Sequence, residues 1–410
     1  MTKCNAVVGQ SGGPTSAINA TLVGVIKGCA EARSAGKIGT LFGMRNGIEG
    51  LLDERLCDLG EHFFDSEWLD TLAQTPAAAL GSCRKKLRSA VEDSATYEKL
   101  LGIFAKYDVH YFFYIGGNDS MDTVHKLSEY AKNCDYDLKV VGIPKTIDND
   151  LEGTDHTPGF GSAAKFVAAT VKEIMRDINV YTVKAVTIVE IMGRDAGWLT
   201  AASALPSAIS GETSPLIYLP ERTFDVEEFV ASVKSAMEKN PAVLVCASEG
   251  IRLANGEYVG SSGQSGTVDV FGHKYLSGTG KVLEGIIKER LGCKVRSVEL
   301  SLPQRCAAHI ASATDISESV GVGMAAVDLA LSNKTGVMAT IERANTENYS
   351  VSYGMADIGG IANAIKTVPK NYISEAGNGV TDECIEYLLP LIAGEINVKY
   401  ECGLPKHVII

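Results

Sequence analysis

The sequence has 410 residues, and its 38 lysines and arginines against 50 aspartates and glutamates give a net charge of −12 at pH 7. A hydrophobic content of 45% with 21% charged residues excludes extended disorder and is typical of a folded protein of about two or three domains. The acidic balance, without any strongly basic stretch, excludes a general nucleic-acid binder, so an anionic ligand needs arginines and lysines gathered locally.

Short apolar runs alternate along the chain with longer stretches of helical periodicity. Strand followed by helix, repeated, predicts βαβ units, and therefore an α/β fold with mostly parallel sheets. Two sets of such units predict two lobes with the active site in the cleft between them. The predicted strands are 5–9, 110–115, 138–143, 185–191, 216–219 and 242–247, and the predicted helices are 16–31, 120–132, 162–178, 225–239 and 280–291.

Ten cysteines are scattered through the chain without a C-x-x-C pair. No run approaches the roughly 18 apolar residues of a membrane-spanning helix, and the first residues do not resemble a secretory signal. We therefore expect a cytoplasmic protein with reduced cysteines and no membrane partner.

The first predicted strand ends in a glycine-rich loop, residues 9–15 (GQSGGPT), which leads into a predicted helix. Glycines let the backbone approach an anion, and the start of a helix offers unpaired N–H groups. The loop lacks the second glycine of a dinucleotide-binding fingerprint and the lysine of a P-loop. By itself it indicates either a tight turn or a phosphate cradle.

A second loop, residues 116–120 (GGNDS), follows a very apolar predicted strand. An amide and a carboxylate at a helix start, here Asn118 and Asp119, suit either helix capping or a complex of Mg²⁺ with phosphate.

The third loop, residues 144–150 (PKTIDND), places two carboxylates, a hydroxyl and a lysine directly after another predicted strand. Lys145 can neutralise a phosphate, and a neighbouring aspartate can accept the proton of an attacking hydroxyl. A purely structural turn has little use for so many charged groups, so this loop favours chemistry.

The fourth loop, residues 192–195 (MGRD), again follows a predicted strand, and Arg194 beside a glycine suits an anion. Arg84, Arg296 and Arg305 supply further cations. Singly, each arginine is equally typical of a solvated surface.

Taken in chain order, these loops resemble the motifs of the phosphofructokinase family. The shared runs are 11–13 (SGG), 81–84 (GSCR), 116–120 (GGNDS), 145–150 (KTIDND), 192–194 (MGR) and 303–305 (PQR). The resemblance extends over residues 3 to about 330 and implies two Rossmann-like lobes with the active site between them. It also implies a donor lobe formed by 1–145 with 306–365 returning to it, a sugar-phosphate lobe formed by 146–305, and a C-terminal extension, 366–410.

The resemblance gives roles to individual residues by their position. Thr146 and Asp148 would meet the reacting 1-hydroxyl of fructose 6-phosphate, with Asp148 as general base. Met192, Gly193 and Arg194 would line the sugar phosphate, and Glu249 would accept a hydrogen bond from a sugar hydroxyl. Arg296 and Arg305 would hold the 6-phosphate, with Arg296 reaching across from a neighbouring subunit of a homodimer or homotetramer. The donor's phosphates would be bound by Gly12, Gly13, Arg84 and Lys145, and Asn118 stands where the family has its Mg²⁺-associated carboxylate.

Two positions indicate the phosphoryl donor. ATP-using members of the family have glycine where this chain has Asp119 and Lys145, and the chain resembles the pyrophosphate-dependent branch. A carboxylate at Asp119 occupies and charges the space that the α-phosphate of ATP needs. Lys145 supplies a cation to pyrophosphate, which has no adenosine to anchor it. We therefore expect Mg²⁺-dependent, reversible transfer from pyrophosphate to fructose 6-phosphate in glycolysis.

Other functions stay open on the sequence alone. The alternatives within the same chemistry are ATP as the donor and sedoheptulose 7-phosphate as the acceptor. A non-catalytic regulatory subunit that binds sugar phosphates is a different class, and it conflicts with the presence of Asp148, Lys145 and Arg194. A lipid or NAD kinase also uses a Gly-Gly-Asn/Asp loop, but it needs neither the 145–150 run nor the 192–194 run.

Overall fold

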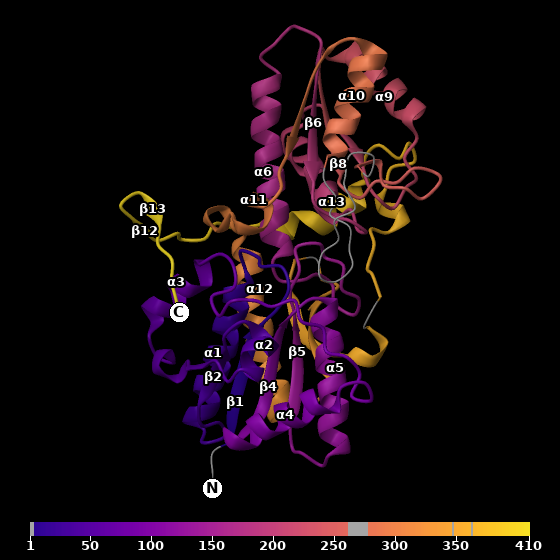
Figure 1. Ribbon diagram of the computed structural model, residues 1–410. Helices are drawn as coiled ribbons and strands as arrows, with labels where there is room; N and C mark the ends of the chain where they lie inside the picture. Colours follow the sequence, from indigo (N-terminus) through magenta and orange to yellow (C-terminus); the bar gives the residue numbers. More distant parts are fainter. Residues whose placement is uncertain (1–3, 261–277, 347, 362–363) are drawn as a thin grey trace.

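The structure is a computed structural model that describes residues 4–260, 278–346, 348–361 and 364–410. Its parallel strands alternate with helices in two sheets, so the predicted α/β fold with two lobes is confirmed (Figure 1). All predicted strands and helices are present, and the largest shift of an end is in the first helix, which ends at Ser34 rather than at residue 31. None of the described helices is long and apolar enough to cross a membrane.

The larger sheet has seven strands in the order β11-β10-β5-β4-β1-β2-β3, and we call it, with its helices, the large lobe. The inner pairs are parallel, while the edge strands β3 and β11 run antiparallel to their neighbours. Its strands are β1 (Asn5–Gln10), β2 (Leu41–Met44), β3 (Leu56–Asp58), β4 (Val109–Gly116), β5 (Lys139–Pro144), β10 (Val337–Arg343) and β11 (Val351–Asp357). Its helices are α1 (Ile18–Ser34), α2 (Gly47–Leu52), α3 (Ser66–Gln74), α4 (Ser94–Lys106), α5 (Asn118–Asn133) and α12 (Ala313–Leu331), with 3₁₀ turns at Gly60–His62 and Ile358–Gly360.

The smaller sheet has four parallel strands in the order β7-β8-β6-β9, and we call it, with its helices, the small lobe. Its strands are β6 (Ala185–Ile191), β7 (Leu216–Tyr218), β8 (Ala242–Ser248) and β9 (Lys294–Glu299). Its helices are α6 (Phe160–Ile178), α7 (Trp198–Ala201), α8 (Leu205–Ser210), α9 (Val226–Lys239), α10 (Thr279–Leu291) and α11 (Pro303–Cys306), with 3₁₀ turns at Ala202–Ala204 and Ala308–Ile310.

Each sheet is covered on both faces, as apolar residues on both sides of its central strands require. In β4, Phe113 and Ile115 pack into the core under α1 and α12, while Phe112 and Tyr114 pack on the opposite face with α4 and α5. Successive side chains of a strand point to opposite faces of the sheet, so a strand with a continuous apolar run has to be covered on both faces. This arrangement fixes the strand ends, and the loops that follow them, relative to one another.

Helices α1 and α12 approach closely because glycines face each other at their crossing. A Cβ on Gly24 would lie 2.1 Å from the carbonyl oxygen of Val320, and one on Gly323 would lie 2.3 Å from that of Thr21. Only residues without a side chain allow backbones to come this near. The contact positions α12 across the lobe junction, where Asp315 accepts hydrogen bonds from Gly159 and Ser162 at the start of α6, both at 2.9 Å.

The C-terminal segment, residues 366–410, contacts both lobes. Helix α13 (Asp382–Leu388) packs its Cys384 and Leu388 into the core of the small lobe. The chain then crosses to the large lobe, where Val408 donates a backbone hydrogen bond to Thr75 at 2.9 Å (Figure 1). Its remaining elements are the 3₁₀ turns Lys370–Tyr372 and Leu389–Ile392 and a short hairpin of β12 (Tyr400–Glu401) and β13 (Leu404–Pro405).

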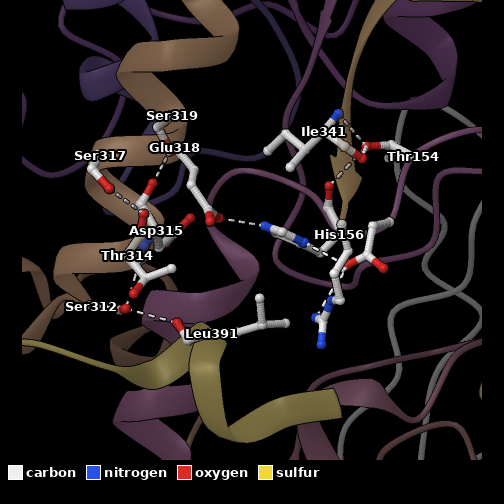
Figure 2. A network of polar contacts seen from close by, with 12 residues as sticks. Thr154, His156, Ser312, Thr314, Asp315, Ser317, Glu318, Ser319, Ile341 and Leu391 are labelled. Atoms are coloured by element: carbon white, nitrogen blue, oxygen red, sulfur yellow. Dashed lines mark hydrogen bonds and ion pairs between the residues drawn. The ribbon is translucent and has the colours of Figure 1, made fainter. Parts of the chain in front are cut away.

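A buried histidine in the loop between β5 and α6 is joined to α12 and β10 of the large lobe by a chain of charged groups. His156, which is 1% exposed, contacts Asp155 at 2.8 Å through Nδ1 and Glu318 of α12 at 2.6 Å through Nε2 (Figure 2). Burial disfavours the imidazolium, but the hydrogen bonds to both carboxylates outweigh it and raise the pKa of His156. Arg343 of β10 extends the chain by pairing with Asp155 at 3.1 Å.

We expect the His156→Gln variant to lose about 3 kcal/mol of unfolding free energy at pH 6, because the buried carboxylate of Glu318 and the half-buried carboxylate of Asp155 lose their cation. The pKa of His156 is raised in the folded state, so its contribution is complete below the unfolded value near 6.5 and disappears as the pH rises through the folded value. Denaturant unfolding at pH 6 and pH 9 measures this difference. His407→Gln, at an exposed histidine, is the control, and an equal loss at both pH values would show that His156 is neutral.

Candidate active site

Residues that directly follow five parallel strands meet in one cavity of about 470 Å³ between the lobes. Strands β1, β4 and β5 contribute from the large lobe, and β6 and β8 from the small lobe. The carboxyl ends of parallel strands are the usual location of ligand sites in such sheets. The lining residues are Ser11, Gly12, Gly13, Arg84, Lys85, Lys86, Gly117, Asn118, Asp119, Ser120, Lys145, Thr146, Asp148, Asp150, Met192, Arg194, Asp195, Ala196, Glu249 and Ile365.

Most of the residues named from the sequence line this cavity together. They are Gly12, Gly13, Arg84, Asn118, Asp119, Lys145, Thr146, Asp148, Met192, Arg194 and Glu249. Gly193 lies beside them and donates its backbone N–H to Glu249 Oε1 at 3.4 Å. The four loops that are far apart in the sequence therefore form one site.

Two predicted arginines do not line the cavity. Arg296 is exposed on the edge strand β9. Arg305 lies in the short helix α11, and its guanidinium stands beside the glycine loop. A Cβ built on Gly13 would lie 3.2 Å from Nη1 of Arg305. Arg305 is therefore next to the loop assigned to the donor, while the preceding Gln304 accepts a hydrogen bond from the backbone N–H of Met192, after β6, at 3.1 Å.

Lys145 lies beneath the glycine loop that follows β1. Its ammonium donates a hydrogen bond to the carbonyl of Gly13 at 2.6 Å and the side chain is 3% exposed. Gly12 has a φ of 78°, and a Cβ there would stand 3.3 Å from Lys145 Nζ. Burial lowers the pKa of Lys145 to about 8, with Arg305 and Arg84 adding to the effect and Asp148 and Asp150 opposing it. The chain thus supplies from β5 the lysine that its glycine loop lacks.

Two half-buried carboxylates, Asp148 and Asp150, follow Lys145 in the same loop. Burial, with the neighbouring Asp150, raises the pKa of Asp148 to about 7, against the opposing effects of Arg194 and Lys145. Burial also raises the pKa of Asp150. The backbone N–H of Asp148 donates to Thr146 Oγ1 at 3.1 Å, which closes the turn. A carboxylate whose pKa lies near neutrality is suited to accept a proton in catalysis.

The small lobe contributes a cation and a second acid opposite this loop. The Nε atom of Arg194 is buried and, in the part of the chain that the structure describes, has no hydrogen-bond partner. A buried donor of this kind is suited to receive an anionic oxygen. Burial, with the charge of Asp148, raises the pKa of Glu249 to about 8. A neutral Glu249 can donate as well as accept a hydrogen bond to a sugar hydroxyl.

Asp119, the predicted donor selector, forms an ion pair at the rim of the cavity. Its Oδ1 lies 3.0 Å from the ammonium of Lys86, and the two side chains are 37% and 51% exposed. Lys86 was not predicted as a site residue, although the basic run 84–86 was a visible signal for it. Asp119 therefore acts with a lysine at this end of the site, and not as an isolated negative charge.

The donor atoms present suit a metal ion that arrives with a phosphate ligand. Among the described residues there is no group of three or more His, Cys, Asp or Glu side chains placed to hold a metal. Asn118 Oδ1 is buried without a partner in the described structure, and Asp119 lines the cavity beside it. Mg²⁺ in phosphoryl-transfer sites takes one or two protein ligands and completes its shell with phosphate oxygens and water.

Comparisons with known proteins agree with this geometry. A protein of Xanthomonas campestris pv. campestris named pyrophosphate–fructose 6-phosphate 1-phosphotransferase is 43% identical over 411 residues, which cover 100% of this chain and 96% of that protein. A protein of the same name from Methylococcus capsulatus is 41% identical over 408 residues, covering 99% and 96%. The crystal structure of pyrophosphate-dependent phosphofructokinase from Nitrosospira multiformis matches with a TM-score of 0.89 and 39% identity, covering 99% of this chain and 96% of that one. Residues 5–330 match the family model for phosphofructokinase, and the chain therefore belongs to the phosphofructokinase family.

Proposed function

We propose that this protein transfers a phosphoryl group from pyrophosphate to the 1-hydroxyl of fructose 6-phosphate, giving fructose 1,6-bisphosphate and phosphate, reversibly, as a step of glycolysis. The observation that carries the proposal is that Lys145 and Asp148 line one cavity, Lys145 as a buried cation against the glycine loop and Asp148 as a carboxylate with a pKa near 7. The names of the similar proteins support the same donor and acceptor.

On the acceptor side, Asp148 takes the proton of the 1-hydroxyl as the sugar oxygen forms its bond to phosphorus. The bridging P–O bond of pyrophosphate breaks in the same displacement, and orthophosphate leaves. Arg194 binds an anionic oxygen of the sugar phosphate through its buried Nε, and Glu249 binds a sugar hydroxyl. Thr146 holds the turn in which Asp148 lies.

On the donor side, Gly12, Gly13 and Arg84 bind the pyrophosphate while Lys145 stabilises the charge that develops on the departing phosphate. Mg²⁺ would be held by Asn118 and Asp119 and would neutralise phosphate oxygens when bound. The Asp119–Lys86 pair closes the side of the site that the α-phosphate of a nucleotide would need. Donor choice therefore rests on Asp119 and Lys145.

The direct test is to supply the purified protein with Mg²⁺, fructose 6-phosphate and either pyrophosphate or ATP, and to measure fructose 1,6-bisphosphate. Turnover with pyrophosphate alone, and phosphate-driven reversal, is the expected result. Turnover with ATP alone would keep the acceptor chemistry and reject the donor assignment. Turnover only when sedoheptulose 7-phosphate replaces fructose 6-phosphate would reject the acceptor. Binding of fructose 6-phosphate without any turnover would indicate a regulatory subunit.

We also propose a homodimer or homotetramer in which Arg296 of one subunit contacts the sugar phosphate of the next. In support, Arg296 is exposed on the edge strand β9 and stands outside the cavity of its own chain. We expect Arg296→Ala to raise KM for fructose 6-phosphate about tenfold or more, because a charge-assisted hydrogen bond is lost. Arg290→Ala, which removes an exposed arginine paired with Glu227, is the control. A monomer by light scattering with full activity would reject the shared site.

A cytoplasmic location is proposed on the state of the cysteines. All ten lie in the described part of the chain and each is free. Four of them are buried among apolar residues, and burial raises the pKa of the Cys29, Cys246 and Cys384 thiols. Unreactive reduced thiols are typical of a reducing compartment.

A further inference from the structure

The C-terminal segment, which lies beyond the region matched by the family model, contacts the loop that carries the two carboxylates. The backbone N–H of Lys366 donates to the carbonyl of Asp150 at 2.9 Å. The hydroxyl of Tyr387, on α13, accepts a hydrogen bond from Asn149 Nδ2 at 3.0 Å. Tyr387 and Lys366 of this segment therefore form hydrogen bonds with Asn149 and Asp150, the two residues directly after Asp148.

Asn149 is the residue of the loop that most needs support. It has a φ of 54°, in the left-handed region that asparagine tolerates better than most residues, and it is fully buried. Its Oδ1 atom has no partner within the described ranges, so Tyr387 supplies the one side-chain hydrogen bond of its amide there. Because Asn149 lies between Asp148 and Asp150, its backbone conformation sets the directions in which their side chains point.

Tyr387 is itself fixed on several sides. Its hydroxyl donates to the carbonyl of Asp155 at 2.7 Å, and its own carbonyl accepts from both terminal nitrogens of Arg343 at 3.1 Å. Its ring packs with the ring of Trp198, their centroids 5.1 Å apart. Burial and the charge of Asp155 raise its pKa, so the phenol stays protonated and can donate. Arg343 and Asp155 also belong to the chain of charged groups around His156, which connects Tyr387 to Glu318 of α12.

We propose that Tyr387 is a positioning residue for catalysis: its hydroxyl fixes Asn149 from behind and so holds the Asp148 carboxylate in the direction of the sugar's 1-hydroxyl. This inference rests on the proposed phosphoryl transfer. A small displacement of a catalytic group reduces the rate more than it reduces substrate affinity, since the sugar's own binding residues are not moved. The C-terminal segment is thus a working part of the active site.

The test is Tyr387→Phe, which removes the hydroxyl and keeps the ring. We expect kcat to fall about fivefold, the rate equivalent of one neutral hydrogen bond, with KM for both substrates within about twofold. Tyr372→Phe is the matched control, because that ring packs on Tyr387 with centroids 5.8 Å apart but takes no part in the contacts of Asn149 and Asp155 described above. Equal losses in the two variants, or a loss confined to KM, would overturn the proposal.

A second variant separates positioning from general destabilisation. Asn149→Gly keeps the left-handed backbone and removes the amide, so in that background Tyr387→Phe should cost less than about twofold in kcat. If Tyr387→Phe lowers kcat fivefold in both the wild-type and the Asn149→Gly backgrounds, the proposed coupling between Tyr387 and Asn149 is rejected.

Hydrogen–deuterium exchange of residues 146–150 provides a readout that needs no turnover, and Tyr387→Phe should exchange faster there than Tyr372→Phe. An inactive wild-type protein whose loop still responds in this way would reject the proposed function and keep the link between Tyr387 and the loop. Unchanged exchange in an active protein would reject the link alone.

Discussion

We expect the Asp148→Asn variant to lose about a thousandfold in kcat while KM for fructose 6-phosphate changes little, because the amide cannot accept the proton of the attacking hydroxyl. Asparagine has the same shape as aspartate, so the turn closed by Thr146 is preserved. The measurement is the steady-state rate of fructose 1,6-bisphosphate formation with pyrophosphate and Mg²⁺. A variant with the kcat of the wild type would remove Asp148 from the role of base.

The matched control for this change is Asp195→Asn. Asp195 lines the same cavity, but its carboxylate is paired with Arg252 at 2.6 Å. Removing it alters the charge of the site by the same amount without touching the turn of Asp148. We expect the control to lose less than about tenfold in kcat, so a comparable loss in both variants would indicate a general electrostatic effect.

The pH dependence of the wild-type protein tests the same assignment from another side. The pKa of Asp148 is about 7 and that of Lys145 about 8, and the reaction needs Asp148 ionised and Lys145 protonated. The value of kcat/KM should therefore fall as the pH decreases below 7 and fall again as it increases above 8. In Asp148→Asn the acidic limb should disappear from the residual activity, while the alkaline limb should stay.

The sequence predicted the parts of the fold in which burial leaves a local pattern. Strands such as β4 and β8, packed on both faces, are continuous apolar runs that need no knowledge of the partner strand. The strands β9 and β11 were missed because these edge strands are mostly exposed or half-buried and so lack a continuous apolar run, as in the charged run 294–299 (KVRSVE). Helix α12 was missed because its small residues face α1 on one side and the sheet on another, which leaves no single apolar stripe.

The same distinction applies to the site. Lys145 and Asp148 were predicted because their chemistry is concentrated in one loop after a strand. The support behind that loop is not local: Tyr387 is 238 positions from Asn149, and Glu318 is 162 positions from His156. Neither pair has a sequence spacing that predicts contact, and each forms only when the C-terminal segment and α12 fold against the small lobe.

Replacing both donor-selecting residues, in the Asp119→Gly/Lys145→Gly variant, should lower kcat/KM with pyrophosphate by about a thousandfold and create measurable turnover with ATP. The loss follows because the glycine loop no longer has the buried ammonium that Gly13 contacts at 2.6 Å, and preorganised cations of this kind contribute about two to three orders of magnitude to rate. The gain follows because the nucleotide no longer meets the carboxylate at the rim or the lysine that fills the space under Gly12. The rates with each donor, measured as fructose 1,6-bisphosphate, give the change in preference.

Single variants separate the effect of charge from the effect of steric exclusion on the choice between pyrophosphate and ATP. Asp119→Gly alone should admit ATP weakly and lower the pyrophosphate activity less than the double variant does, since one Mg²⁺ ligand is lost but the buried ammonium of Lys145 remains in place. Lys86→Met keeps the carboxylate but removes its partner 3.0 Å away, so repulsion should raise KM for pyrophosphate several-fold without any gain with ATP. If the double variant loses pyrophosphate activity and gains none with ATP, the nucleotide is excluded by other parts of the site, because the two groups that occupy its place would already be gone.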